Sequence, residues 1–202
     1  VQIADIQYPT SFDSRFIPDY LYPRYATAAE LPDGRLLVAE RVLAAQKEVV
    51  KLVTLSPDGA RLTQWPATFE GGPVSSLRLL DGGKVLAIGG FTNVSGLSRP
   101  GMVRLDPDGS VDAAFNPSQL GSGIIDLPFY GWPGSAATLP GGGLLTFIVT
   151  HSADGSDLWM LIKLQPNGET DPGFKPLTFE AGSNPKILPD TRGRILFSGF
   201  LK

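Results

Sequence analysis

The chain has 202 residues, 42% of them hydrophobic, so it is long enough to bury a core of its own and too apolar to be disordered. Its formal net charge of −3 comes without a cluster of Lys or Arg, which argues against nucleic acid as a partner. It contains no Cys, which excludes disulfides, Cys-bound zinc and thiol catalysis, and its apolar runs are too short for membrane insertion.

The first 18 residues, VQIADIQYPTSFDSRFIP, predict a strand, a turn that contains Pro, and a second strand that ends near Phe16 and Pro18. The next stretch predicts four strands. They are TAAELPD, the Gly-led GRLLVAERV, VVKLVTLS with its Pro57-Asp58-Gly59 turn, and a strand that ends on Trp65 before Pro66. In this turn Pro presets φ, Asp caps its own backbone and Gly takes a positive φ.

The same order of elements returns twice. The first strands are SSLRLLDG and SAATLPGG, the Gly-led second strands are GKVLAIGGF and GGLLTFIVT, and the third strands are GMVRLDPD and LWMLIKLQ. Pro-Asp-Gly or Pro-Asn-Gly follows each third strand, and the fourth strands end on Phe115 and Phe174, each two residues before a Pro. A fourth copy, PKILPDTR and GRILFSGFL, stops at Lys202 after its second strand.

Four antiparallel strands in each repeat of about 50 residues predict the blades of an all-β β-propeller. We expect one domain over residues 1–202, with blades at about 26–65, 72–115, 135–174, and 184–202 completed by 1–16. Closing the last blade with N-terminal strands removes the free sheet edges. The alternatives are a larger ring made by two chains, a slice of a longer array, and a β-sandwich, which would leave the repeat unexplained.

The segments VLAIGGFTNVSG and RPGMVRLDPDGSVDAAFNP, within residues 85–117, resemble the delta-60 repeat of bacterial surface and secreted proteins. The other units match this repeat only in outline, through the Gly-led strand, the turn and the final aromatic and Pro. The resemblance implies a propeller-like fold and a secreted or cell-surface setting in bacteria. It implies no cofactor and no catalytic residues.

Alternate connections of a propeller lie on opposite faces, so the sequence divides into tight turns and long loops. The connections between strands 1 and 2 and between strands 3 and 4 are tight, which leaves little room for a ligand. The longer connections are 41–48, 92–101, 150–157, 16–25 and 115–135. Because function concentrates on such loops, we expect any ligand there.

Aromatic and charged residues of these loops are the candidate binding residues. They are Tyr20, Tyr22, Arg24, Tyr130, Trp132, His151, Asp154 and Asp157. Aromatic rings stack on sugars and anchor protein interfaces, although the same rings could instead seal the contacts between blades. His151 near two carboxylates could also be a general base, but no second His exists to build a larger constellation.

No metal site is predicted. The segment DPDGSVD places Asp106, Asp108 and Asp112 close together, but its Gly comes too early for a calcium loop and the bidentate Glu is missing. We therefore interpret it as a structural turn.

These observations favour a non-catalytic propeller that binds or scaffolds, presenting its loops to a protein or glycan partner. One alternative is a polysaccharide-acting enzyme, a glycosidase or lyase, on the long-loop face. Another is a structural subunit that assembles by exchange of its terminal strands. The oligomeric expectation is a monomer or a strand-exchanged oligomer.

Overall fold

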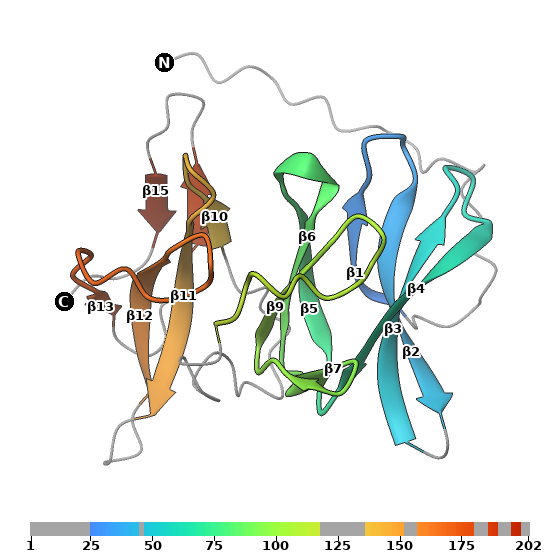
Figure 1. Cartoon of the computed structure of the whole chain (residues 1–202), viewed down its shortest axis with the longest axis horizontal. Coiled ribbons are helices and arrows are strands. Elements are labelled where there is room, and N and C mark those ends of the chain that lie inside the picture. The colour runs from blue at the N-terminus through green and yellow to red at the C-terminus, as the bar shows by residue number, and fades with distance from the viewer. Residues whose placement is uncertain are drawn as a thin grey trace.

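The computed structural model describes residues 25–44, 47–117, 136–151, 157–179, 186–189 and 195–198, and this part of the chain is all-β (Figure 1). The first seven strands are β1 Tyr25–Glu30, β2 Leu36–Ala44, β3 Lys47–Leu55, β4 Arg61–Glu70, β5 Val74–Leu79, β6 Val85–Gly89 and β7 Asn93–Val94. The others are β8 Leu97–Ser98, β9 Met102–Leu105, β10 Ala136–Thr138, β11 Leu144–His151, β12 Asp157–Leu164, β13 Leu177–Phe179, β14 Lys186–Pro189 and β15 Ile195–Ser198. A single 3-10 turn, Asp81–Gly83, joins β5 to β6. Within these residues no helix is long and apolar enough to cross a membrane.

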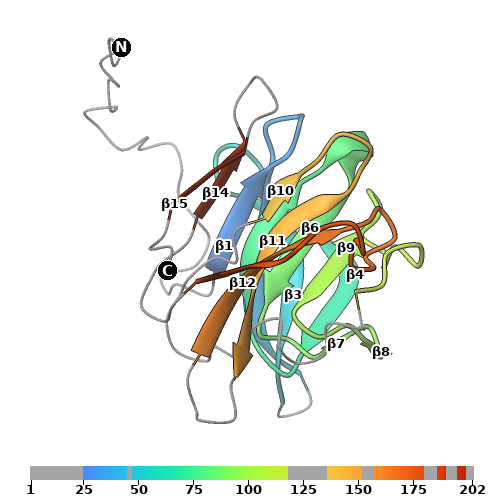
Figure 2. The same cartoon turned by 90° about the vertical axis from the view of Figure 1, so that its left-hand side faces the viewer.

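The strands form four antiparallel sheets that stand side by side in chain order (Figures 1 and 2). Their orders are β1-β2-β3-β4-β7-β8, β5-β6-β9, β10-β11-β12-β13 and β14-β15. The first strand of a sheet lies next to the first strand of the following sheet in two places, β1 against β5 and β10 against β14. We call the four sheets blades 1 to 4. The predicted all-β fold is confirmed, whereas a closed ring of four blades stays a prediction because residues 1–16 lie outside the described part.

The tight turns follow from their residues. In blade 2 the Gly109 amide donates to the Asp106 carbonyl (2.8 Å), and the Asp106 amide donates to the Ser110 carbonyl (2.9 Å). Gly109 has φ +83°, a conformation that costs a residue with a side chain about 1–2 kcal/mol. Blade 3 repeats this arrangement around Gly168, with φ +89°. The turns therefore hold strands 3 and 4 together at one end of each blade.

Apolar clusters join neighbouring blades. The largest unites Leu37, Ala39 and Leu52 of blade 1 with Val85 and Val103 of blade 2, all of them fully buried. A second cluster joins blades 2 and 3, and a third joins blade 3 to Ile187 of blade 4. Each contains the aromatic residue that the sequence places at the end of a repeat: Trp65, Phe115 and Phe174 respectively.

At the turn end of the sheets, each aromatic segment sits on the next blade's turn. A methyl group placed on Gly109 would lie 2.8 Å from the ring of Trp65 and from Pro66. A methyl group on Gly168 would lie 3.0 Å from the backbone of Asn116, whose amide donates to the Asn167 carbonyl (2.8 Å). We call this contact the aromatic–turn clamp. The contact favours glycine for two reasons: the turn has a positive φ, and the aromatic segment of the preceding blade lies close to the glycine.

At the opposite end, a short hairpin of blade 2 joins the sheet of blade 1. Strand β7 pairs with β4 through Phe69↔Val94 and Glu70↔Asn93, and β8 pairs with β7 across a turn at Ser95 and Gly96. The buried ring of Phe91 lies 5.0 Å from that of Phe69, edge to face. This hairpin occupies the predicted loop 92–101, and strands β2 and β3 likewise occupy most of the predicted loop 41–48.

The fourth strands differ from the prediction. In blade 1, β4 continues past Trp65 to Glu70. In blades 2 and 3 the segment directly after the turn makes a single bridge, Leu105↔Val111 or Leu164↔Thr170. In blade 3 the chain rejoins the sheet only after Phe174, where β13 pairs with β12. In both blades an aspartate three residues after the turn glycine interrupts the pairing with the third strand. In blade 2 it is Asp112, whose carboxylate accepts the Ala114 amide (2.9 Å) and turns the chain away from the sheet.

We predict that Gly109→Ala destabilises the protein more than Gly34→Ala. Both glycines have a positive φ, but a methyl group at Gly34 meets nothing within 4 Å. Gly34→Ala should cost about 1–2 kcal/mol, and Gly109→Ala about 1–3 kcal/mol more because it forces Trp65 and Pro66 away. Urea unfolding of the two variants measures the difference, and equal losses would refute the clamp.

Candidate functional site

A cavity lies between blades 1 and 2, at the turn end of the sheets. Its volume is about 360 Å³. Three turns surround it: the β1–β2 turn with Pro32 and Asp33, the β5–β6 turn with Gly83, and the β9 turn with Pro107 and Asp108. The sequence prediction had put ligands at the other end, where the connections are long. Here the tight turns of two neighbouring blades enclose a space above Trp65 and Pro66.

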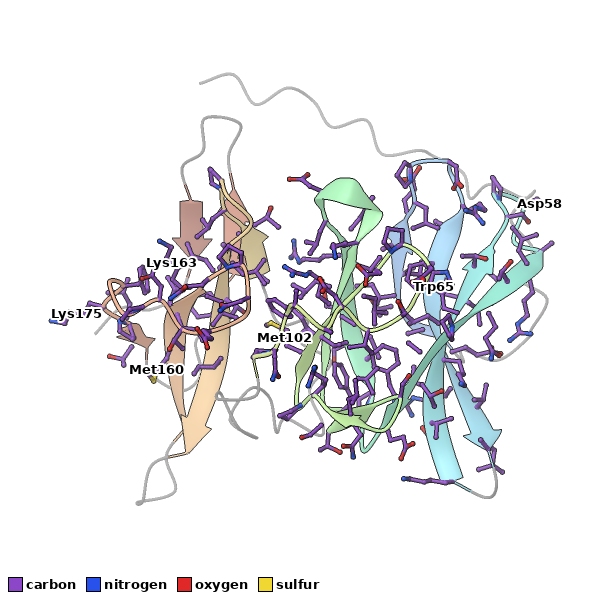
Figure 3. All side chains as sticks on the ribbon, in the orientation of Figure 1. Asp58, Trp65, Met102, Met160, Lys163 and Lys175 are labelled. Carbon is purple, nitrogen blue, oxygen red and sulfur yellow. The ribbon has the colours of Figure 1, made fainter. Side chains whose placement is uncertain are left out.

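The floor of this cavity is apolar and its rim is polar. The floor comprises Leu31, Leu79, Pro66 and Trp65, whose side chain is 8% exposed. Figure 3 shows Trp65 at the turn end of the molecule, directed toward blade 2. The rim carries amide, hydroxyl, carboxylate and guanidinium groups. Such a combination suits a small amphipathic group, for example a sugar ring, which offers an apolar face and a hydroxyl edge.

An ion pair within one turn fixes the charged part of the rim. The Arg35 guanidinium donates through Nε to Asp33 Oδ2 (2.8 Å), and its Nη2 lies 2.7 Å from the same oxygen. The Arg35 amide donates to Asp33 Oδ1 (3.1 Å). These hydrogen bonds lower the pKa of the Asp33 carboxyl and raise the pKa of Arg35. Both groups are about half exposed, so they remain accessible to a ligand.

The polar groups of β3 and β4 face the cavity from the other side. Thr54 Oγ1 accepts the Thr63 amide (3.1 Å) and donates to the Thr63 carbonyl (3.1 Å), so it is fully engaged. Gln64 is exposed, and its Oε1 lies 3.4 Å from Arg61 Nη2. A side-chain amide both donates and accepts, which leaves Gln64 the most adaptable partner for a ligand hydroxyl.

Most of the candidate binding residues lie outside the described part of the chain. They are Tyr20, Tyr22, Arg24, Tyr130, Trp132 and Asp154. The backbones of His151 and Asp157 are described: they end β11 and begin β12, and the two residues pair directly across the ladder. The structure thus brings these two together at the loop end, and the binding role of the whole set stays a prediction.

The loop end has a feature that the sequence analysis missed. Leu43 in β2 is 77% exposed and Leu97 in β8 is 46% exposed, and both belong to hairpins at this end of the sheets. Exposed leucines are a common element of protein–protein contacts, but single exposed leucines are also ordinary on a surface. The sequence carried a signal for this feature, because the two leucines lie within the predicted loops 41–48 and 92–101.

The described carboxylates of blade 2 serve the fold. Asp112, with 6% of its side chain exposed, accepts from Arg104 Nε (2.6 Å) and from Lys84 Nζ (2.8 Å). Lys84 also contacts Asp106 (2.5 Å), and the guanidinium of Arg104 lies 4.7 Å from the centre of the Phe115 ring. Burial works against the charged form of Asp112, but the hydrogen bonds from Lys84 and Arg104 outweigh it and lower the pKa of this carboxyl.

Other blades use their carboxylates in the same way. In blade 3 the Lys163 ammonium and the Gly173 amide lower the pKa of Asp171. In blade 1 the buried Glu40 pairs with Arg61 (3.0 Å). Among the described residues, no group of three His, Cys, Asp or Glu side chains could hold a metal ion.

The comparison with family models agrees with the architecture. Residues 83–115 match a family model described as a domain of unknown function (DUF5122) beta-propeller. No curated protein matches. A solved structure, described as a hypothetical protein from Leishmania major, is similar with 11% identity and a TM-score of 0.37, over 86% of this chain and 62% of that chain. The chain therefore spans less than two thirds of that protein.

We predict that Asp112→Asn lowers the free energy of unfolding at pH 7 by about 2 kcal/mol, because two charge-assisted hydrogen bonds are weakened. The folded-state pKa of Asp112 is below its usual value, so its contribution is present above about pH 4 and is lost as the pH falls through that lowered value. The difference between wild type and variant should therefore shrink below about pH 4.

Urea unfolding between pH 7 and pH 2.5 tests this. Asp81→Asn, in the exposed β5–β6 turn, is the control and should change stability by less than about 0.5 kcal/mol. A wild-type advantage over Asp112→Asn that persists unchanged to the lowest pH would contradict the assignment.

Proposed function

We propose that this chain is a non-catalytic β-propeller module that binds a glycan or protein partner, in a bacterial secreted or cell-surface assembly. The cavity between blades 1 and 2 is the observation that carries the binding function. Its apolar floor around Trp65 and its polar rim of Asp33, Arg35 and Gln64 offer the two kinds of contact that a sugar ring requires. The cellular setting follows from the resemblance to delta-60 repeats.

The electrostatics of the described carboxylates support a non-catalytic role. A glycosidase needs one carboxyl group whose pKa is raised, so that it can act as an acid. The shifts of Asp33, Asp58, Asp108, Asp112 and Asp171 all go the other way. Their causes are hydrogen bonds from neighbouring turn and strand residues, which is what structural carboxylates show. The enzyme alternative would depend on residues such as Asp154, outside the described part.

The first experiment is a binding screen with a set of neutral and acidic hexasaccharides, followed by isothermal titration with the best of them. We expect Gln64→Ala to weaken binding about fivefold, the equivalent of one hydrogen bond. Leu62→Ala is the matched control on the same strand, because Leu62 is 51% exposed and does not line the cavity. It should leave the affinity unchanged.

Two results would redirect the proposal. If Trp132→Ala abolishes binding and Gln64→Ala does not, the ligand occupies the loop end that the sequence predicted. If no saccharide binds while Leu43→Asp and Leu97→Asp abolish capture of a purified protein partner, the module recognises protein through its exposed hairpins.

A further inference from the structure

The turn glycine between strands 3 and 4 is buried in all three described turns, although the two residues before it are exposed. These glycines are Gly59, Gly109 and Gly168, and each has a positive φ. For Gly109 and Gly168 the cover is the aromatic segment of the preceding blade. Gly59 belongs to blade 1, so by the same rule its cover precedes blade 1 in the ring.

Blade 1 also has a second buried apolar face. Val38, Val53 and Leu55 are 3%, 0% and 1% exposed and form a cluster of their own. In the described part of the chain this cluster, with Leu36 packed against it, draws only on β2 and β3, whereas every other cluster unites two neighbouring blades. An apolar sheet face needs a covering layer. The face and the Gly59 turn together define one docking surface on blade 1.

A sequence motif accompanies the known covers. In blades 2 and 3 an Asp stands three residues before a Phe, which stands two residues before a Pro: Asp112, Phe115, Pro117 and Asp171, Phe174, Pro176. In both, the Asp carboxylate accepts the amide two residues on, and the Phe amide donates to the Asp carbonyl. The same spacing occurs once more, as Asp13, Phe16 and Pro18.

The third copy of the motif has the right place in the chain. Each aromatic segment docks on the blade that follows it directly. Val74, the first residue of β5, comes eight positions after Pro66. Tyr25, the first residue of β1, comes seven positions after Pro18. The connection is therefore long enough to reach from the docking surface to the start of blade 1.

Charge complementarity links the same motif to blade 4. In blade 2 Asp112 pairs with Arg104 on β9 and with Lys84, which directly precedes β6. Arg194 directly precedes β15 in the same way, because Pro189↔Ile195 occupies the register position of Leu79↔Val85. Arg194 is thus the blade 4 counterpart of Lys84, and Asp13 is the counterpart of Asp112.

We propose that residues 13–18 of this chain dock on blade 1, with Phe16 on the face of Val38, Val53 and Leu55 and Pro18 over the turn of Gly59. In this arrangement Asp13 pairs with Arg194 of the same chain. The N-terminal segment then joins blade 4 to blade 1 by the same contacts that join blade 2 to blade 3, and one chain closes its own ring.

A charge swap in the full chain tests the ion pair. Asp13→Arg and Arg194→Asp should each lower the Tm by about 2–4 °C, and the double variant should recover most of the loss. Asp19→Arg combined with Arg194→Asp is the matched control, since it makes the same change of charge outside the motif, and it should show no recovery. Additive losses in the Asp13→Arg/Arg194→Asp chain would overturn the pairing.

Mixing the two single variants separates closure within one chain from pairing between two chains. If the segment docks on a second copy, a heterodimer of Asp13→Arg and Arg194→Asp chains restores both ion pairs, so the mixture would regain the wild-type Tm and have the mass of a dimer in light scattering. We expect no recovery in the mixture and a monomer mass throughout. Recovery in the mixture would overturn closure within the chain.

A second measurement tests the docking surface even if the charge variants fail to fold. Gly59→Ala and Gly34→Ala both place a methyl group at a positive φ, but the site at Gly34 is open. If a segment covers Gly59, the first variant should lower the Tm by several degrees more than the second. Equal shifts would overturn the docking surface.

Discussion

The contact between an aromatic–proline segment and the buried turn glycine of the next blade sets the geometry of the structure. At Gly109 and Gly168 the backbone takes a positive φ, and a methyl group would lie 2.8 Å and 3.0 Å, respectively, from atoms of the neighbouring blade. Two requirements thus meet at one residue, the shape of the turn and the spacing of the blades. Because the aromatic ring also enters the apolar cluster between the two sheets, turn, spacing and core are coupled.

The clamp also explains where the cavity lies. Trp65 packs against the blade 2 turn, and residues from the turns of both blades line the same cavity, so its ring becomes part of a floor with polar groups around it. The charged groups nearby are already committed to partners within the protein, as the Asp33–Arg35 pair and the Asp112 cluster show. These charged groups therefore have fixed orientations in the fold.

The repeat could be recognised from the sequence because its turns and strands depend on local chemistry. Pro-Asp-Gly and Pro-Asn-Gly admit few backbone conformations, and the continuous apolar runs in strands such as β2 and β3 require two buried faces. The contacts between blades could not be predicted from the sequence. Nothing local indicated that residues 93–98 form a hairpin on β4, since that hairpin depends on Phe91 meeting Phe69 from another repeat. The short fourth strands of blades 2 and 3 had a local signal in Asp112 and Asp171, because each carboxylate caps the backbone.

The sequence by itself determined the all-β class, the succession of strands and the turns, because periodicity and turn chemistry act over a few residues. It also identified the aromatic residue that ends each repeat. Only the tertiary structure decided what the aromatic segments of blades 1 and 2 do, which is to cover a glycine in the next blade. It also decided that a cavity forms among the tight turns of blades 1 and 2. Both depend on distances between segments about 40–60 residues apart, which packing of whole sheets determines and no local preference encodes.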